Sequence, residues 1–194
     1  ESCEIVKNFV SGYDRNIHLE GDIGNNSIIN NTLEGSDFGI LIYCVPMSNV
    51  KGKPIRIESN RISNKNFPNN LKLKKIRNSE ERCLLSFFAK DGCRENSVIS
   101  NNTFQIYPQY GYQYSAIVRF LEKGLNVDNN VFISNLATNA QKSVLFLYPA
   151  QNLKGNTFDN VKVNFKLPSS TKAILNANEG NRVINKSNSN ILLH

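Results

Sequence analysis

One short phrase recurs along this chain: Asn, any residue, an apolar residue, one more residue, and then Asn or Ser. The phrase occurs six times, at intervals of 25 to 36 residues, beginning at Asn26, Asn60, Asn96, Asn130, Asn156 and Asn181. Self-similarity at a period of about 20–50 residues is typical of repeat architectures, in which one small unit is stacked on the next. Asparagine makes up 31 of the 194 residues. Because it is so common, it is the regular spacing of the asparagines that constrains the fold.

Apolar residues keep the same register as the phrase. Two residues after the leading Asn stand Ile28, Ile62, Val98, Phe132, Phe158 and Val183; three residues before it stand Ile23, Ile57, Cys93, Val127, Leu153 and Asn178. Short β-branched and aromatic runs lie between the copies, at 40–43, 84–88, 116–120, 144–148 and 173–175. Runs of this length, bounded by Gly, Asn, Asp or Pro, are typical of buried strands.

These patterns predict an all-β fold, a single-stranded right-handed parallel β-helix of about six coils, with residues 1–194 in one domain. Each coil would contain three strands and lie ~4.8 Å from the next coil. Asn suits the corners because it tolerates left-handed backbone and bonds to its own main chain. Stacked Asn side chains also hydrogen-bond to one another as a ladder, which is the role we expect for the repeated asparagines.

The repeated phrase resembles the parallel β-helix repeats of the pectate-lyase-like superfamily. That group includes polysaccharide lyases, glycoside hydrolases, epimerases and the tailspikes of phages, so the resemblance implies a protein that engages polysaccharide. It extends over residues 20 to 190. The calcium-binding aspartates of pectate lyases and the paired aspartates of polygalacturonases have no matching motif here, so no catalytic residue carries over.

Several other chemistries find no support in the sequence. The two histidines, His18 and His194, lie far apart, and no CxxC or HExxH spacing suggests a metal site. Motifs for a nucleophilic serine, a phosphate loop or a dinucleotide are absent, so we expect no cofactor. No apolar stretch approaches the ~20 residues of a membrane span.

The four cysteines leave the disulfide state open. Cys93 falls in the apolar column and Cys44 ends a buried run, so both are expected to pack in the core. Cys83 and Cys93 are close enough in sequence to form a disulfide, but inward packing of Cys93 argues against that bond.

Carboxylates are the natural catalysts of glycosidic cleavage, which needs one acid and one base or nucleophile. Two residues before the leading Asn stand Gly24, Glu58, Arg94, Asp128, Lys154 and Glu179. Their alternating charges suit a surface ladder of ion pairs. The catalytic alternative places Glu58 and Asp128 two coils apart, at ~9.6 Å, on either side of Arg94; inverting glycosidases separate their carboxyl groups by ~6.5–9.5 Å.

Two further features suggest contact with a sugar. Residues 105–115 form a Tyr-rich insertion between coils, and its Tyr107, Tyr110, Tyr112 and Tyr114 are candidates for stacking on sugar rings. The net charge is +7, and basic residues crowd the second coil and the connection after it, with Arg56 and Arg61 as candidate contacts. Such a patch attracts polyanions, and without a nucleic-acid motif an acidic glycan is the better partner. The alternative for the tyrosines is a loop packed back on the surface of the β-helix. The alternative for the basic residues is a solvated loop that blocks aggregation.

The sequence therefore predicts a module that binds, and in one alternative depolymerises, an acidic cell-surface or extracellular glycan. If it is an enzyme, it is a glycoside hydrolase or a polysaccharide lyase. The competing function is a non-catalytic adhesin or a structural spike segment. Apolar runs at both ends suggest either a fragment of a longer β-helix or a homotrimer, and we expect an extracellular or virion-surface location.

Overall fold

Parallel strands account for almost all the regular structure. The computed structural model describes residues 2–21, 24–44, 52–66, 82–89, 94–111, 113–148, 150–165 and 180–184. Within these residues the strands form three sheets, and neighbouring strands in each sheet are parallel.

The sheets are numbered in the order of their first strands in the chain. The first sheet contains β1 (Glu4–Val6), β4 (Asn26–Ile29), β7 (Ile55–Glu58), β10 (Val98–Ser100), β13 (Asn126–Asp128) and β16 (Asn152–Lys154). The second contains β2 (Phe9–Ser11), β5 (Thr32–Glu34), β8 (Arg61–Ser63), β11 (Thr103–Ile106), β14 (Val131–Ser134), β17 (Thr157–Asp159) and β19 (Arg182–Ile184). The third contains β3 (Arg15–Glu20), β6 (Phe38–Cys44), β9 (Cys83–Ala89), β12 (Ala116–Phe120), β15 (Ser143–Phe146) and β18 (Lys162–Phe165).

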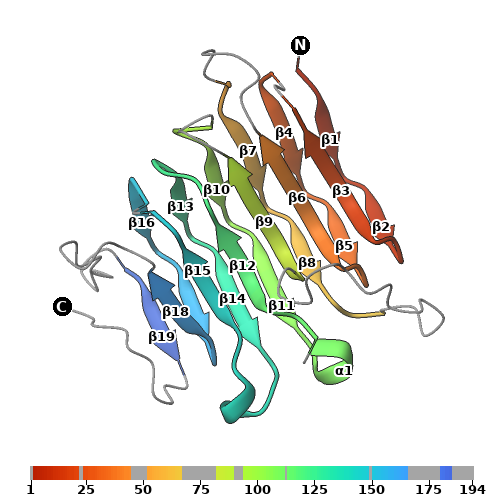
Figure 1. Ribbon diagram of the computed structural model, residues 1–194, viewed down its shortest axis with the longest axis vertical. Coiled ribbons are helices and arrows are strands. Elements are labelled where there is room, and N and C mark those ends of the chain that lie inside the picture. Colours follow the sequence, from red (N-terminus) through yellow and green to blue (C-terminus); the bar gives the residue numbers. More distant parts are fainter. Residues whose placement is uncertain are drawn as a thin grey trace.

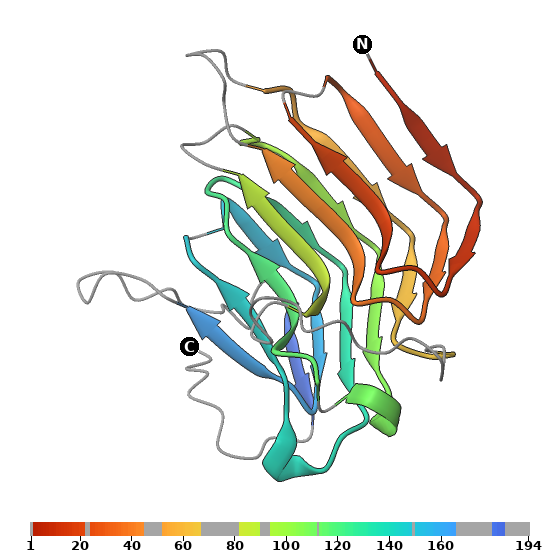
Figure 2. The same ribbon diagram turned by 45° about the vertical axis from the view of Figure 1, so that its right-hand side comes forward.

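Successive strands of each sheet are stacked along one direction of the molecule, from β1, β2 and β3 at one end to β18 and β19 at the other (Figures 1 and 2). The short helix α1 (Pro108–Gly111) and the 3-10 turn η2 (Thr138–Ala140) lie at the corners after β11 and β14. The prediction of an all-β chain built from parallel strands is confirmed, and the arrangement is compatible with a parallel β-helix. Four of the predicted runs coincide with β6, β9, β12 and β15, while the run at 173–175 lies outside the described residues.

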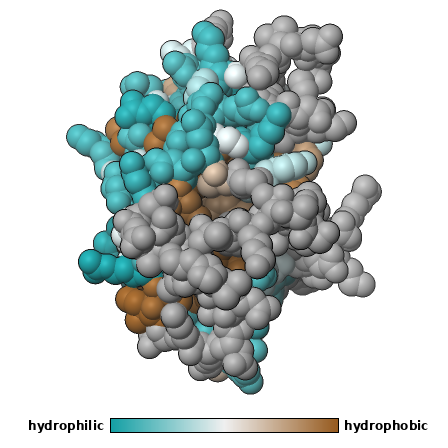
Figure 3. Space-filling view, turned by 90° about the vertical axis from the view of Figure 1, so that its left-hand side faces the viewer, coloured by the Kyte–Doolittle hydropathy of each residue, from teal (hydrophilic) through white to brown (hydrophobic). Residues whose placement is uncertain are grey.

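The core lies between the sheets and is built from columns of matching side chains. Phe104, Phe132 and Phe158 are register partners on the second sheet, and their rings stack with centroids 5.2 and 5.1 Å apart. All three are fully buried. Outward positions alternate with these inward ones, and Figure 3 shows one face of the resulting surface, on which hydrophobic patches stand between hydrophilic side chains.

The asparagine ladder exists, and its members form one column beside the second sheet. They are Asn8, Asn31, Asn60, Asn102, Asn130, Asn156 and Asn181. From Asn8 to Asn156, the backbone N–H and the side-chain Nδ2 of each asparagine both donate to the Oδ1 of the next one along the stack. For Asn102 and Asn130 both distances are 3.0 Å. The other Nδ2 hydrogen reaches back to a carbonyl of the first sheet, as from Asn102 to Ile57 O at 2.8 Å.

Two members of the predicted ladder are wrong. Asn26 begins β4 in the first sheet and accepts a hydrogen bond from Cys3 N, and Asn96 lies exposed in a turn. Their places belong to Asn31 and Asn102, which the strict phrase excluded because Gly35 and Ile106 stand four residues later. Every ladder asparagine is followed two residues later by an apolar residue, but so is Asn26, which precedes Ile28. The local pattern therefore does not by itself identify the ladder members.

At each corner, the residue with left-handed backbone and the ladder asparagine are neighbours in the chain. A positive φ occurs immediately before every ladder position, at Lys7, Asn30, Ser59, Asn101, Asn129, Gly155 and Gly180. At Gly155 a Cβ would lie 2.0 Å from Asn129 Oδ1, so a larger residue at that corner would require the exposed Asn129 side chain to move. The chain turns at the first residue of each pair, and the second residue supplies the ladder amide.

Replacing Asn102 by Ala removes an amide on which both neighbouring coils depend. Asn60 then loses the acceptor of its N–H and Nδ2 groups, and Ile57 O loses its donor. Each buried unsatisfied group costs about 1–3 kcal/mol, and three groups lose a partner, so we expect urea unfolding to show a loss of at least about 3 kcal/mol. The exposed Asn135→Ala is the control, expected to change stability by less than about 0.5 kcal/mol. Equal effects of the two substitutions would contradict the ladder.

Candidate functional site

The predicted catalytic residues Glu58 and Asp128 lie on the first sheet, at the ends of β7 and β13. Ser100 at the end of β10 pairs with Glu58 on one side and with Asp128 on the other. Arg94 does not stand between them, so that part of the prediction is wrong. The phrase beginning at Asn96 had shifted the third coil by six residues relative to the true ladder position, Asn102.

Glu58 and Asp128 already have partners on the sheet surface. Arg56 Nε and Nη2 donate to the two carboxylate oxygens of Glu58 at 3.1 and 2.8 Å. Asp128 Oδ2 accepts a hydrogen bond from Asn152 Nδ2 at 3.3 Å. Two strand spacings separate the carboxylates, which is ~9.6 Å. These contacts differ from the predicted ladder of ion pairs between coils, because Glu58 pairs with Arg56 on its own strand and Ser100 lies between the two carboxylates. A catalytic role for the pair stays a prediction.

Arg94 is fully buried in the turn before β10. Its Nη1 donates to Lys53 O at 2.5 Å, and its backbone N–H donates to Glu122 Oε2 at 3.2 Å. Glu122 is itself only 2% exposed, and this burial raises the pKa of its carboxyl group. These contacts tie the connection after β12 to the corner before β10, which is a structural role.

The Tyr-rich segment 105–115 does not present a row of exposed rings. Tyr107 is half-buried, and its hydroxyl donates to Gln105 Oε1 at 3.0 Å. Tyr110 is also half-buried and has a positive φ of 59° inside α1. Tyr112 lies outside the described residues. Tyr114 is 2% exposed and cannot stack on a sugar, so its predicted role is wrong.

Tyr114 belongs to a buried polar cluster at the corner before the third sheet. Its hydroxyl donates to Ser36 O, and burial raises the pKa of the phenol well above its ordinary value. Beside it Arg82 Nε donates to Asp37 Oδ1 at 2.7 Å, and both side chains are less than one-tenth exposed. Burial raises the pKa of Asp37 although Arg82 opposes the shift. The cluster joins three coils, and no local sequence signal marks it.

Only part of the predicted basic patch can be placed. Lys53, Arg56, Arg61 and Lys65 are described and exposed, on or beside β7 and β8; the remaining patch residues, Lys51, Lys72, Lys74, Lys75 and Arg77, lie outside the described residues. Arg56 is engaged by Glu58, whereas Arg61 lies on the outer face of the second sheet.

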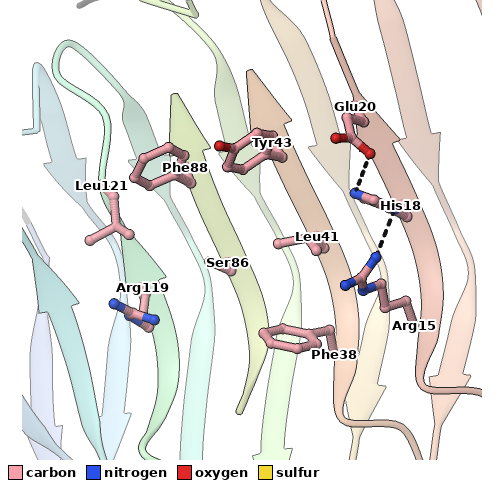
Figure 4. Close-up of a pocket in the computed structure, with 10 residues that line it drawn as sticks. All are labelled: Arg15, His18, Glu20, Phe38, Leu41, Tyr43, Ser86, Phe88, Arg119 and Leu121. Atoms are coloured by element: carbon pink, nitrogen blue, oxygen red, sulfur yellow. Dashed lines mark hydrogen bonds and ion pairs between the residues drawn. The ribbon is translucent and has the colours of Figure 1, made fainter. Parts of the chain in front are cut away.

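A groove of about 500 Å³ lies on the outer face of the third sheet, across β3, β6, β9 and β12 (Figure 4). We call it the third-sheet groove. It is lined by Arg15, His18, Glu20, Phe38, Leu41, Tyr43, Ser86, Phe88, Arg119 and Leu121. His18, Leu41, Ser86 and Arg119 form one register row, and Glu20, Tyr43 and Phe88 form the next.

A stacked aromatic pair occupies the middle of the groove. Tyr43 on β6 and Phe88 on β9 are register partners, with ring centroids 5.1 Å apart and planes 10° from parallel. Tyr43 is 39% exposed. Leu41 and Leu121 lie beside the rings (Figure 4), so the groove has an apolar centre.

Charged side chains stand at the two ends of this apolar centre. On β3 Arg15 Nη1 lies 3.4 Å from His18 Nδ1, and His18 Nε2 lies 3.6 Å from Glu20 Oε2. On β12 Arg119 points into the same groove (Figure 4). A ligand that spanned β3 to β12 would meet positive charge at both ends and aromatic rings between them.

The sequence prediction missed this groove because it treated the runs at 40–43 and 84–88 as wholly buried. Tyr43 and Phe88 occupy alternate, outward positions of those runs. Period-2 alternation could have marked both residues, but the connection between β6 and β9 is long and of irregular length, so the sequence alone does not put them opposite each other.

Cys44, at the buried end of β6, is disulfide-bonded. Neither Cys3 nor Cys83 forms a disulfide, so the partner of Cys44 lies outside the described residues. The alternative bond between Cys83 and Cys93 is therefore wrong. The place expected for Cys93 in the apolar column belongs to Ile99, the register partner of Ile57 and Val127.

In the described part of the chain, no group of three or more His, Cys, Asp or Glu side chains could hold a metal ion. No helix among those residues has the length and apolar character to cross a membrane.

Comparison of the chain with protein-family models, with curated proteins and with solved structures gives no match. The function is therefore argued from the chain's own residues.

Tyr114→Phe tests whether the phenol is structural. Without the hydroxyl, Ser36 O is left buried without its donor, and we expect thermal or urea unfolding to show a loss of about 1–3 kcal/mol. Tyr13→Phe is the control, because Tyr13 is 63% exposed, and it should leave stability unchanged. A Tyr114→Phe protein of normal stability that had lost glycan binding would restore the sugar-contact role.

Proposed function

We propose that this chain is a glycan-binding module with the third-sheet groove as its site. In this proposal the parallel sheets form a right-handed parallel β-helix of the pectate-lyase-like type, as the sequence resemblance implies. The observation that carries the proposal is the stacked pair of Tyr43 and Phe88 in a groove flanked by charged side chains.

The dimensions and lining of the groove suit a saccharide. Binding sites for small ligands are usually ~300–1,000 Å³, with an apolar lining and a few polar groups that fix orientation, and this groove has about 500 Å³. The C–H face of a sugar ring packs on an aromatic face, and the edges of such rings leave the sugar hydroxyls free to hydrogen-bond. Tyr43 also carries a hydroxyl of its own at the groove.

The charges favour an acidic glycan. A guanidinium group presents a planar set of donors that matches a carboxylate in a bidentate geometry. Arg15 and Arg119 offer two such groups, and Glu20 is the only carboxylate among the described lining residues. A sugar acid, such as a uronate, would therefore gain more from this groove than a neutral sugar.

Binding without cleavage is the function that the groove supports better. Glycosidases normally use two carboxyl groups on either side of the scissile bond, and the described part of the groove holds one, Glu20. The alternative is a depolymerase that acts through Glu58 and Asp128 on the first sheet, away from the groove.

An extracellular or virion-surface location accords with the disulfide at Cys44, because disulfides persist in oxidising compartments. The homotrimer predicted from the sequence remains a prediction, and sedimentation at micromolar concentration tests it.

Tyr43→Ala tests the aromatic site. We expect it to weaken binding of the best acidic ligand from a glycan array by about tenfold, which corresponds to ~1.4 kcal/mol and is within the range of aromatic pair energies. Calorimetry or microarray titration measures the change. Tyr148→Ala is the matched control, since Tyr148 is exposed to a similar degree, 45%, and does not line the groove. If both variants bind as the wild type does, the groove is not the site.

A second measurement separates binding from cleavage. We expect the wild-type chain to bind the selected glycan without releasing new reducing ends, because one carboxylate does not complete a hydrolytic pair. Reducing-end release that disappears in Glu58→Gln or Asp128→Asn would establish the depolymerase instead, with Glu4→Gln, an exposed carboxylate on β1 of the same sheet, as the control.

A further inference from the structure

A second, smaller pocket lies on the outer face of the second sheet, over β5, β8 and β11. Its volume is about 50 Å³, and its lining includes Arg61, Ser63 and Lys65 from β8 and the residues after it, and Thr103, Gln105 and Tyr107 from β11 and its end. We call it the second-sheet pocket. It shares no lining residue with the third-sheet groove.

Hydrogen-bond donors dominate this pocket. The Tyr107 hydroxyl donates to Gln105 Oε1 at 3.0 Å, so the carbonyl end of that amide is occupied and its NH2 group remains to donate. The Ser63 hydroxyl oxygen accepts from Lys65 N at 3.4 Å, which leaves its proton for another acceptor. Thr103, which also lines the pocket, is the register partner of Arg61 on the neighbouring strand and carries a further hydroxyl group.

Two cations in the pocket have no carboxylate partner among the described residues. The ion pairs of the described residues are those of His18, Arg56, Arg82 and Lys123, and neither Arg61 nor Lys65 belongs to one. The one carboxylate in the lining, Glu34, accepts a hydrogen bond from Asn66 Nδ2 at 2.7 Å. Two positive charges and several neutral donors therefore face one engaged carboxylate.

We propose that the second-sheet pocket binds one tetrahedral oxyanion, a sulfate or phosphate group. A cavity needs about 10–15 Å³ to hold one ordered water, so this pocket has room for a few waters or one such group, and it is too small for a sugar ring. Arg61 and Lys65 supply charge-assisted hydrogen bonds, which are the strong ones, and the hydroxyl and amide donors complete the shell. The anion is either free or the ester group of a larger molecule.

Isothermal titration at constant ionic strength, with sodium sulfate or sodium phosphate replacing chloride, tests the site. We expect saturable binding that Arg61→Gln and Lys65→Gln each weaken by about tenfold or more, because each substitution removes a charge-assisted hydrogen bond to the anion. Glu34→Gln should strengthen binding, because it removes the one negative charge in the lining.

The matched control is Arg182→Gln. Arg182 lies on β19 in the same outward row of the second sheet as Arg61, four strands further along the stack, and is exposed. Its substitution removes the same charge from the same face and should leave anion binding unchanged. Equal weakening by Arg61→Gln and Arg182→Gln would show general charge attraction and would overturn the site, as would the absence of saturable binding.

A monosaccharide 6-sulfate and a monosaccharide 6-phosphate distinguish the two sources of the anion. Tighter binding of an ester than of the inorganic ion, with both weakened by Arg61→Gln, supports the site and assigns it to the ester group. Equal binding supports the site and assigns it to the free ion. Glycan binding at the third-sheet groove is read out separately through Tyr43→Ala, so either proposal can fail while the other stands.

Discussion

The asparagine ladder is the interaction on which the rest of the structure depends. Each ladder amide gives one hydrogen to a carbonyl of the preceding coil and one to the Oδ1 of the next asparagine, so consecutive coils are joined at a buried corner. A buried donor without a partner costs ~1–3 kcal/mol. A slip by one residue would break these bonds and also turn the inward side chains outward. The ladder therefore fixes register as well as contributing stability.

The fixed register of the strands brings residues that are distant in the chain together in the two candidate binding sites. Tyr43 and Phe88 are 45 positions apart in the chain, yet they stack because β6 and β9 pair in one register. Arg61 and Thr103 become neighbours in the same way on the second sheet. Outward side chains on parallel strands line up in rows, so a repeat fold can carry more than one binding surface without changing its core.

The repeat was visible in the sequence because the ladder and core columns impose the same residue types on every coil. Asn60, Asn130, Asn156 and Asn181 were placed in the correct column. Asn31 and Asn102 were missed because the chain is rich in Asn and a neighbouring copy of the phrase matched more strictly. The predicted site inherited that error: Arg94 was put where Ser100 lies. The groove, the buried ion pair of Arg82 with Asp37 and the disulfide at Cys44 depend on contacts across connections of irregular length, which no local pattern encodes.

The most direct test of the account is chemical-shift mapping on the ¹⁵N-labelled protein, titrated with the best acidic oligosaccharide from a glycan array. The account predicts that the perturbed amides lie on β3, β6, β9 and β12, around Tyr43 and Phe88, because the register of the third sheet brings the binding residues together there. Perturbations centred on Glu58 and Asp128 of the first sheet, or saturable binding that leaves the third sheet unchanged, would contradict it.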